Sequence, residues 1–102
     1  MCSSDLRKTD VFDRWLRNLK DRQAVVKIAA RIDRLAFGMP GDVKSVGAGL
    51  MEMRIDYGPG YRVYYLPRGA MYIILLCGGD KSSQARDIDR ATKLALKHKD
   101  SE

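Results

Sequence analysis

The feature that most constrains the fold is a change in the period of the hydrophobic pattern at Gly41. Before this residue, apolar side chains recur with helical spacing, whereas after it they alternate or form short apolar runs separated by Gly or Pro. A period near 3.6 predicts helices, and a period of two or a short apolar run predicts strands. The chain is therefore predicted to place helices first and a sheet afterwards.

Two helices are expected before Gly41. Asp10 and Asp21 are the predicted N-caps, and Gly38 with Pro40 is predicted to end the second helix. The simplest interpretation is a helical hairpin with one continuous apolar side. The apolar stripes are Val11, Phe12, Trp15, Leu16 and Leu19, then Ala24, Val25, Ile28, Ala29, Ile32, Leu35 and Ala36. The outer face is interpreted as a solvated surface of cations, namely Arg14, Arg17, Lys20, Arg22, Lys27, Arg31 and Arg34.

Four strands are expected after Gly41, and short connections favour antiparallel hairpins. The run 70–78 has apolar residues at both odd and even positions, so it is predicted to be the central strand, covered on both faces. Ser82 or Ser83 is predicted to cap a last helix with a short apolar seam. The four segments are "DVKSV" (42–46), "LMEMRID" (50–56), "YRVYYLP" (61–67) and "AMYIILLCG" (70–78).

These elements predict one α+β domain over residues 1–102, with an N-terminal helical hairpin packed on a four-stranded antiparallel sheet and a C-terminal helix. Residues 1–6 are interpreted as a flexible or artificial tail. The 102 residues carry 19 Lys and Arg against 13 Asp and Glu, a net charge of +6 that favours an anionic partner.

No targeting or membrane signal is expected. The longest apolar run, 70–77, is strand-length, and the N-terminus lacks a signal-peptide core, so the default location is the cytoplasm. Cys2 and Cys77 match no metal or redox spacing, and Cys77 is predicted to be a buried free thiol.

The "GPG" turn (58–60) sets which side chains share a face of the sheet. With a three-residue loop, Tyr57 pairs with Tyr61, Asp56 lies opposite Arg62, and Arg54 lies opposite Tyr64. One face then carries Met51, Met53, Ile55, Tyr61, Val63 and Tyr65, and the other carries Glu52, Arg54, Asp56, Arg62 and Tyr64. The second face is either an ordinary solvated surface with an Asp56–Arg62 pair or a platform that holds cations for chemistry.

The segment "CGGDKSSQ" (77–84) favours the second interpretation. It runs from the end of a strand into the start of a helix, where backbone N–H groups attract anions, and Lys81 adds a positive charge there. P-loop spacing is absent. Arg54, Arg62 and Lys81 are therefore predicted to form a catalytic cationic groove for phosphates. The predicted RNA-binding residues around it are Tyr64, Arg68, Lys44 and Gln84.

The predicted reaction uses no metal and no cofactor. His98 is the only histidine, which rules out a two-histidine ribonuclease, and no set of metal ligands is visible. Arginine and lysine can still hold a scissile phosphate and stabilise its transition-state charge, and RNA supplies its own 2′-OH nucleophile. Glu52 or Asp80 is a candidate base, although a salt-bridge or capping role is commoner for each. Such a site is expected to act poorly on free RNA.

"GPGYRVYY", "YIILLCGGDKSSQARDI" and "RKTDVFDRWLRNLKD" together resemble the addiction-module killer proteins, a HigB-like branch of the RelE/ParE toxin superfamily. The resemblance covers about residues 7–98. It implies a compact α+β fold and metal-independent mRNA cleavage in the ribosomal A site. It also implies inhibition by a helix-turn-helix, HigA-like antitoxin encoded in the same operon. The Gly-Tyr-Arg element assigns the phosphate-binding role to Arg62, with Arg54 and Lys81 at further basic positions of the superfamily.

The expected function is thus that of a type II toxin that cleaves mRNA on the ribosome, with ribosome, mRNA and antitoxin as partners and neither a membrane nor a small-molecule substrate. Two alternatives stay open: a ParE-like poison of DNA gyrase, and an inactive module that only binds its partner. The sequence departs from some ribosome-dependent members because its last helix lacks a tyrosine. His98 is only a loose positional match for an acid–base group.

Overall fold

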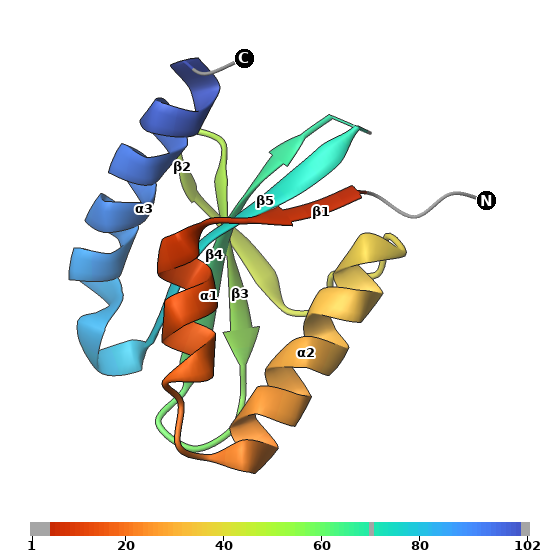
Figure 1. Ribbon diagram of the computed structural model, residues 1–102, viewed down its shortest axis with the longest axis vertical. Helices are drawn as coiled ribbons and strands as arrows, with labels where there is room; N and C mark the ends of the chain where they lie inside the picture. The colour runs from red at the N-terminus through yellow and green to blue at the C-terminus, as the bar shows by residue number, and fades with distance from the viewer. Residues whose placement is uncertain (1–4, 70, 101–102) are drawn as a thin grey trace.

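The computed structural model describes residues 5–69 and 71–100, which form a five-stranded mixed sheet flanked by helices (Figure 1). The elements in chain order are β1 (Asp5–Lys8), α1 (Asp10–Arg17), α2 (Arg22–Ala36), β2 (Val43–Gly47), β3 (Leu50–Ile55), β4 (Tyr61–Arg68), β5 (Tyr72–Asp80), the short 3-10 helix η1 (Lys81–Ser83) and α3 (Gln84–Asp100).

The sheet has the order β1-β5-β4-β3-β2. Strands β2 to β5 form the antiparallel meander that the sequence predicts, and β1 adds a fifth strand that pairs in parallel with β5. The predicted α+β class therefore holds, but the N-terminal helical hairpin on four antiparallel strands is not matched in detail. The chain places a strand before its first two helices.

Strand β1 corrects two expectations. Asp5 and Leu6, which were assigned to a tail, pair with Tyr72 and Ile73 of β5, while residues 1–4 of that tail lie outside the described residues. Strand β4 lies at the centre of the sheet, but β5 is also an interior strand because β1 covers its other edge. The full burial of the run from Tyr72 to Gly78 follows from that position.

The helix termini agree with the sequence only in part. Asp21 caps α2 as predicted, since its Oδ1 accepts from the backbone N–H of Gln23 (3.0 Å) and of Ala24 (3.3 Å). Helix α1 is capped by Thr9 rather than Asp10, because the Thr9 hydroxyl accepts from Phe12 N. At the last helix, Asp80 is the N-cap of η1 in place of Ser82 or Ser83.

Each face of the sheet is covered. Helices α1 and α2 pack on one face, and α3 packs on the other, over β5 and β4 (Figure 1). The first core contains Phe12, Ile28, Ile32, Leu35, Met53, Ile55, Val63, Tyr65, Ile73 and Leu75. The second contains Leu50, Tyr64, Leu66, Tyr72, Ile74, Leu76, Cys77, Ala91 and Ala95. No helix within the described residues is long and apolar enough to cross a membrane.

Candidate phosphate-binding site

The site is built on the hairpin of β3 and β4. Arg54 lies directly opposite Arg62, and Glu52 lies opposite Tyr64. The predicted register was wrong by two residues, because the loop between the strands is longer than "GPG" and pairing starts at Ile55 with Tyr61. A slip of two residues leaves every side chain on its predicted face, whereas a slip of one would have exchanged the faces.

The face that carries these residues is not the open surface that the alternation of side chains along the strands suggested. Tyr64 and Glu52 are completely buried, because α3 covers β4 and β5 and reaches β3. Asp56 is exposed, and the carboxylate that pairs with Arg62 is Glu52 rather than Asp56. The predicted Asp56–Arg62 pair is therefore wrong.

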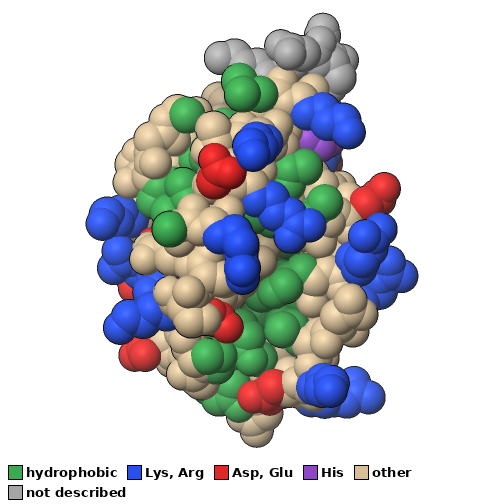
Figure 2. Space-filling view, turned by 90° about the vertical axis from the view of Figure 1, so that its left-hand side faces the viewer, with side chains coloured by type: hydrophobic (Ala, Val, Ile, Leu, Met, Phe, Trp, Pro, Cys, Tyr) green, Lys and Arg blue, Asp and Glu red, His purple; other side chains and the backbone are tan. Residues whose placement is uncertain are grey.

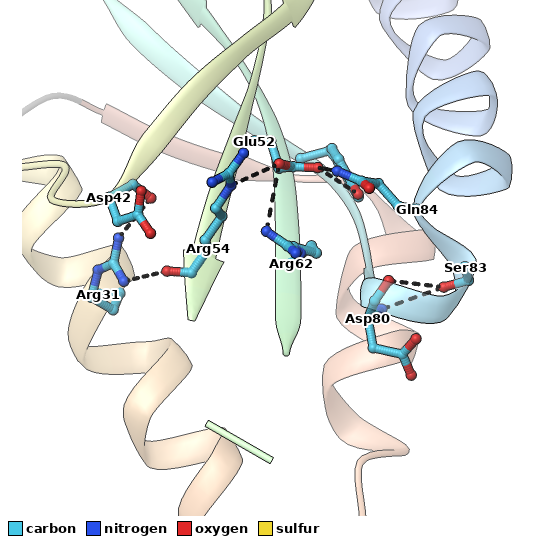
Figure 3. A network of polar contacts seen from close by, with 9 residues as sticks. Arg31, Asp42, Glu52, Arg54, Arg62, Asp80, Ser83 and Gln84 are labelled. Carbon is cyan, nitrogen blue, oxygen red and sulfur yellow. Dashed lines mark hydrogen bonds and ion pairs between the residues drawn. The ribbon is translucent and has the colours of Figure 1, made fainter. Parts of the chain in front are cut away.

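Glu52 is the centre of a network of polar contacts (Figure 3). Its Oε2 accepts from the Tyr64 hydroxyl at 3.0 Å and from Gln84 Nε2 at 2.7 Å. Its Oε1 accepts from Arg54 Nε at 3.2 Å and lies 3.7 Å from a terminal nitrogen of Arg62. We call these five residues the Glu52 cluster. The single carboxylate holds two arginines side by side, and the cluster keeps a net positive charge.

The network fixes the protonation of its members. Burial acts to raise the pKa of Glu52, but hydrogen bonds from Gln84, Arg54 and Tyr64 and the charge of Arg62 outweigh it, so the pKa lies below its usual value. Burial, together with the charge of Glu52, raises the pKa of Tyr64 well above its usual value. At neutral pH Glu52 is a carboxylate that only accepts hydrogen bonds, and Tyr64 is a neutral donor.

Arg62 is the residue of the cluster with unused hydrogen-bonding capacity. Its side chain is 12% exposed, and its Nε is buried with no hydrogen-bond partner among the described residues. Arg54 beside it is 36% exposed, at the side of the sheet that α3 leaves open. A buried N–H without a partner costs free energy, so an anion that reached Arg62 would gain more than from an exposed guanidinium.

The remaining predicted site residues lie at different distances from the Glu52 cluster. Lys44 of β2 is exposed and lies opposite Glu52, so it borders the cluster. Lys81 is exposed beside the "GPG" turn, because a Cβ on Gly60 would lie 3.4 Å from its Cβ. Arg68 lies at the far end of β4, about 20 Å along the strand from Arg62. Arg54, Arg62, Tyr64 and Gln84 are thus brought together, with Lys44 adjacent, whereas Arg68 is not part of the cluster.

The predicted anion site at the start of the last helix is already filled by the protein. Asp80 Oδ1 accepts from Ser82 N at 2.8 Å, and the Ser83 hydroxyl accepts from Asp80 N at 3.3 Å. Asp87 is buried and accepts from the Ser83 hydroxyl. Hydrogen bonds from Ser82, followed by others at this turn, lower the pKa of Asp80, so a negative charge of the protein already lies where a phosphate would bind.

Gly78 and Gly79 serve close packing instead of an anion-binding loop. Both lie in β5, and neither has a positive φ. A Cβ on Gly78 would lie 2.3 Å from Trp15 Cε3 of α1, and a Cβ on Gly79 would meet the carboxylate of Asp87. The two glycines therefore let a helix approach the strand from each face.

Arg31 is a residue of the site whose role the sequence did not predict. It donates to the backbone carbonyls of Arg54 at 2.6 Å and Asp42 at 3.3 Å (Figure 3). It also donates to the backbone carbonyl of Pro40 at 2.9 Å. Assigned to the solvated outer face, it instead holds the backbone of β3 at Arg54. Its position three residues after Ile28, on the buried side of α2, was the signal for an inward side chain.

The one histidine of the sequence, considered as an acid–base group, is remote from the Glu52 cluster. His98 lies about 21 Å along α3 from Gln84. Among the described residues, no three His, Cys, Asp or Glu side chains are grouped so that they could hold a metal ion. Cys77 is a buried free thiol as predicted, and burial raises its pKa to about 12.

Comparisons with known proteins agree with the fold and give the family. The chain is 53% identical over 90 residues to an uncharacterized protein of Haemophilus influenzae, a match that covers 88% of this chain and 91% of the relative. The solution structure of the conserved hypothetical protein HP0894 from Helicobacter pylori superposes with a TM-score of 0.51 at 21% identity, covering 80% of this chain and 97% of that one. Residues 14–99 match the phage-derived protein family Gp49-like (DUF891). The chain therefore belongs to the Gp49-like family, a RelE-like family associated with toxin–antitoxin systems, which implies a protein antitoxin as partner.

Proposed function

We propose that the protein is a HigB-like toxin of a type II toxin–antitoxin system that cleaves mRNA on the ribosome without a metal ion. Its antitoxin is a helix-turn-helix protein of the HigA type. The family supports the toxin role, and the Glu52 cluster supports the chemistry. The observation that carries the proposal is the Nε of Arg62, which has no hydrogen-bond partner in the described part of the chain and is held next to Arg54 in a cluster of net positive charge.

Arg62 and Arg54 bind and orient the scissile phosphate in this mechanism. Two guanidinium groups on neighbouring strands fit the non-bridging oxygens of one phosphate and stabilise the charge that develops on it. Glu52 positions both arginines before RNA arrives, so little reorganisation is needed during the reaction. The nucleophile is the 2′-OH of the RNA itself.

Glu52 is an anchor and not the general base. Both of its oxygens already accept hydrogen bonds, its side chain is fully buried, and its lowered pKa makes it a weak proton acceptor. Asp80 caps a helix, and Tyr64 is held neutral. Because the cluster brings no acid–base group of its own, proton transfer depends on groups that the ribosome or the RNA supplies. We therefore expect slow cleavage of free RNA.

Cleavage mapping in translated and untranslated messages tests this function. The variants are Arg62→Ala, Arg54→Ala and Lys81→Ala, with Arg34→Ala as a matched control because Arg34 is exposed on α2, on the other face of the sheet. We expect cleavage only during translation. The rate should fall about 10²–10³-fold for Arg62→Ala, less for Arg54→Ala, least for Lys81→Ala, and not for Arg34→Ala.

Three outcomes would contradict the proposal in different places. Unchanged cleavage in Arg62→Ala would remove that residue from the mechanism. Intact mRNA together with gyrase-dependent DNA breaks would assign the ParE-like activity instead. Normal growth during expression without the antitoxin would leave only a partner-binding role.

A further inference from the structure

Helix α3 carries a straight row of cations on its outer side. Four exposed Lys and Arg residues of α3 follow one another at intervals of four, three and four residues. This spacing places them within an arc of about 60° around the helix, over a length of about 17 Å. They lie on the side of the helix opposite the buried Ala91 and Ala95. We call this row the basic stripe; its members are Arg86, Arg90, Lys93 and Lys97.

The charge of the stripe is largely uncompensated. Lys93 pairs with Asp89 at 3.2 Å, but both side chains are more than two-thirds exposed, and such a pair is weak and screened by salt. Arg90 and Lys97 make no ion pair within the described residues, and Arg86 acts on the Asp80 carboxylate only through its charge, without an ion pair among those residues. Viewed from the side of α3, the molecule exposes Lys and Arg across its middle and both margins, with fewer Asp and Glu between them (Figure 2).

The alignment is particular to α3 and does not follow from the net charge alone. On α2 the exposed cations Arg22, Lys27 and Arg34 spread over about 140° of the helix circumference. On α1, Arg17 is paired with Asp13. A solubilising surface needs charge but no alignment, whereas a row of phosphates is matched by a row of cations.

We propose that the basic stripe docks the phosphate backbone of double-helical RNA, a second nucleic-acid contact that rests on the proposed function for the choice of RNA. The stripe is one residue wide and carries no Asn or Gln to read adenine, so its base contacts would be limited to guanine, whereas all four cations can bind phosphates. Entry into the wide major groove of B-DNA would press Asp89 and the exposed Leu96 against the bases. A-form RNA presents phosphates across a deep, narrow groove that a single row of cations reaches from outside.

The stripe and the Glu52 cluster bind different strands. Gln84 points from α3 toward Glu52, about 160° around the helix from Arg86. A phosphate held by Arg62 and Arg54 lies on the sheet beside α3, and one held by the stripe lies on the outer side of that helix. The protein therefore lies between a substrate strand and a structured RNA.

The test measures binding of the purified full chain to a labelled RNA duplex of about 20 base pairs. The background is Arg62→Ala, so that cleavage does not interfere. Affinity is followed by fluorescence anisotropy between about 50 and 200 mM salt. The test variant is Arg90→Gln with Lys97→Gln, and the matched control is Arg14→Gln with Arg34→Gln, which removes the same charge from the α1 and α2 side. Thermal melts establish that both variants are folded.

We expect the test variant to bind about tenfold more weakly and to lower the slope of log K against log salt by about 1.5, while the control stays near the parent. An equal loss in both variants would show that only net charge matters and would overturn the proposal. Equal or tighter binding to the same sequence as duplex DNA would overturn the choice of RNA. If poly-glutamate competed for the stripe as effectively as RNA does, the proposal would be overturned and the stripe would be assigned to an acidic protein.

Because this binding is measured without cleavage, its result is independent of the nuclease. If the stripe variant bound the RNA duplex as well as its parent while the protein cleaved mRNA normally, this inference alone would be wrong. Stripe-dependent binding in a protein that cleaves no mRNA would defeat only the proposed function.

Discussion

The two faces of the sheet bury side chains in different ways. The face under α1 and α2 is closed by large apolar groups such as Phe12, Ile28 and Met53, all nearly or fully buried. The face under α3 is closed by small residues, Ala91 and Ala95, and beside them it buries the carboxylate of Glu52 among arginine, tyrosine and glutamine. One face is a conventional core, and the other combines a core with a charged site.

This difference separates stability from function in one small domain. Apolar burial is the main stabilising force in folding and needs no particular charge state. A buried carboxylate is tolerated only while its hydrogen bonds and charges are satisfied, and it does not stabilise a fold better than an apolar group would. We therefore expect substitutions on the two faces to differ in size and, more clearly, in their dependence on pH.

The largest effect is expected on the apolar face. Phe12→Ala removes a side chain that is 1% exposed and packs against Trp15 with ring centroids 5.8 Å apart. Its free energy of unfolding should fall by about 3–5 kcal/mol at any pH where the protein is folded. Urea unfolding followed by circular dichroism measures this. Val26→Ala, at a position of α2 that is 67% exposed, is the control and should change stability by less than about 0.5 kcal/mol.

A smaller effect with a pH signature is expected at Glu52. Glu52→Gln keeps the shape of the side chain but leaves Arg54 and Arg62 opposite each other without a carboxylate. The free energy of unfolding should fall by about 2 kcal/mol at neutral pH. Because the folded-state pKa of Glu52 lies below its usual value of 4.5, the wild-type carboxylate stabilises the fold above that pH, and this contribution is lost as pH falls through the folded-state pKa.

Urea titrations at several pH values test that sign. The variant should lack the part of the acid destabilisation that Glu52 contributes below pH 4.5. Asp89→Asn is the matched control, because Asp89 is an exposed carboxylate paired with a lysine, and it should keep the wild-type pH profile. Parallel acid profiles for the wild type and Glu52→Gln would mean that the polar face is as indifferent to pH as the apolar one.

The sequence predicted the apolar face better than any other part of the fold. Helical and strand periods assigned Phe12 and Ile28 to one core with Met53 and Val63, and the structure joins them. Strand β1 escaped prediction because its four residues include a single apolar one, Leu6, and because its pairing with β5 joins segments far apart in the chain. Local pattern carries no information on such a contact.

The polar face was predictable in its residues but not in its environment. Parity placed Arg54, Arg62, Glu52 and Tyr64 together, and it did so despite the wrong register because an even slip preserves the faces. Their burial depends on where α3 packs, which no pattern within β3 or β4 encodes. The distance of Arg68 from the cluster has another cause: it lies six residues after Arg62 on the same strand, a separation that the sequence already contained.

The smallest effect is expected in how often each face of the sheet opens, measured by the reactivity of a buried cysteine. The comparison does not require that either protein be less stable than the wild type. Cys77 lies under α3 and is 1% exposed, while Val63 on neighbouring β4 faces α1 and α2 and is 0% exposed. Burial raises the pKa of Cys77 to about 12, so alkylation near pH 8 must proceed through opened molecules whose thiol has its ordinary pKa. Two single-cysteine proteins make the comparison: Cys2→Ser, and Cys2→Ser with Cys77→Ala and Val63→Cys.

Position 77 should react about tenfold faster than position 63. Helix α3 packs through two buried alanines, the half-buried Ile88 and Leu94, and a polar cluster. A groove of about 470 Å³ runs beside its second half, lined by Thr92, Ala95 and Leu96. Fewer apolar contacts must break to lift α3 than to lift α1 and α2. Iodoacetamide labelling followed by mass spectrometry gives both rates. Equal rates would mean that the two faces open only by global unfolding, and that the charged site costs the α3 face nothing in local stability.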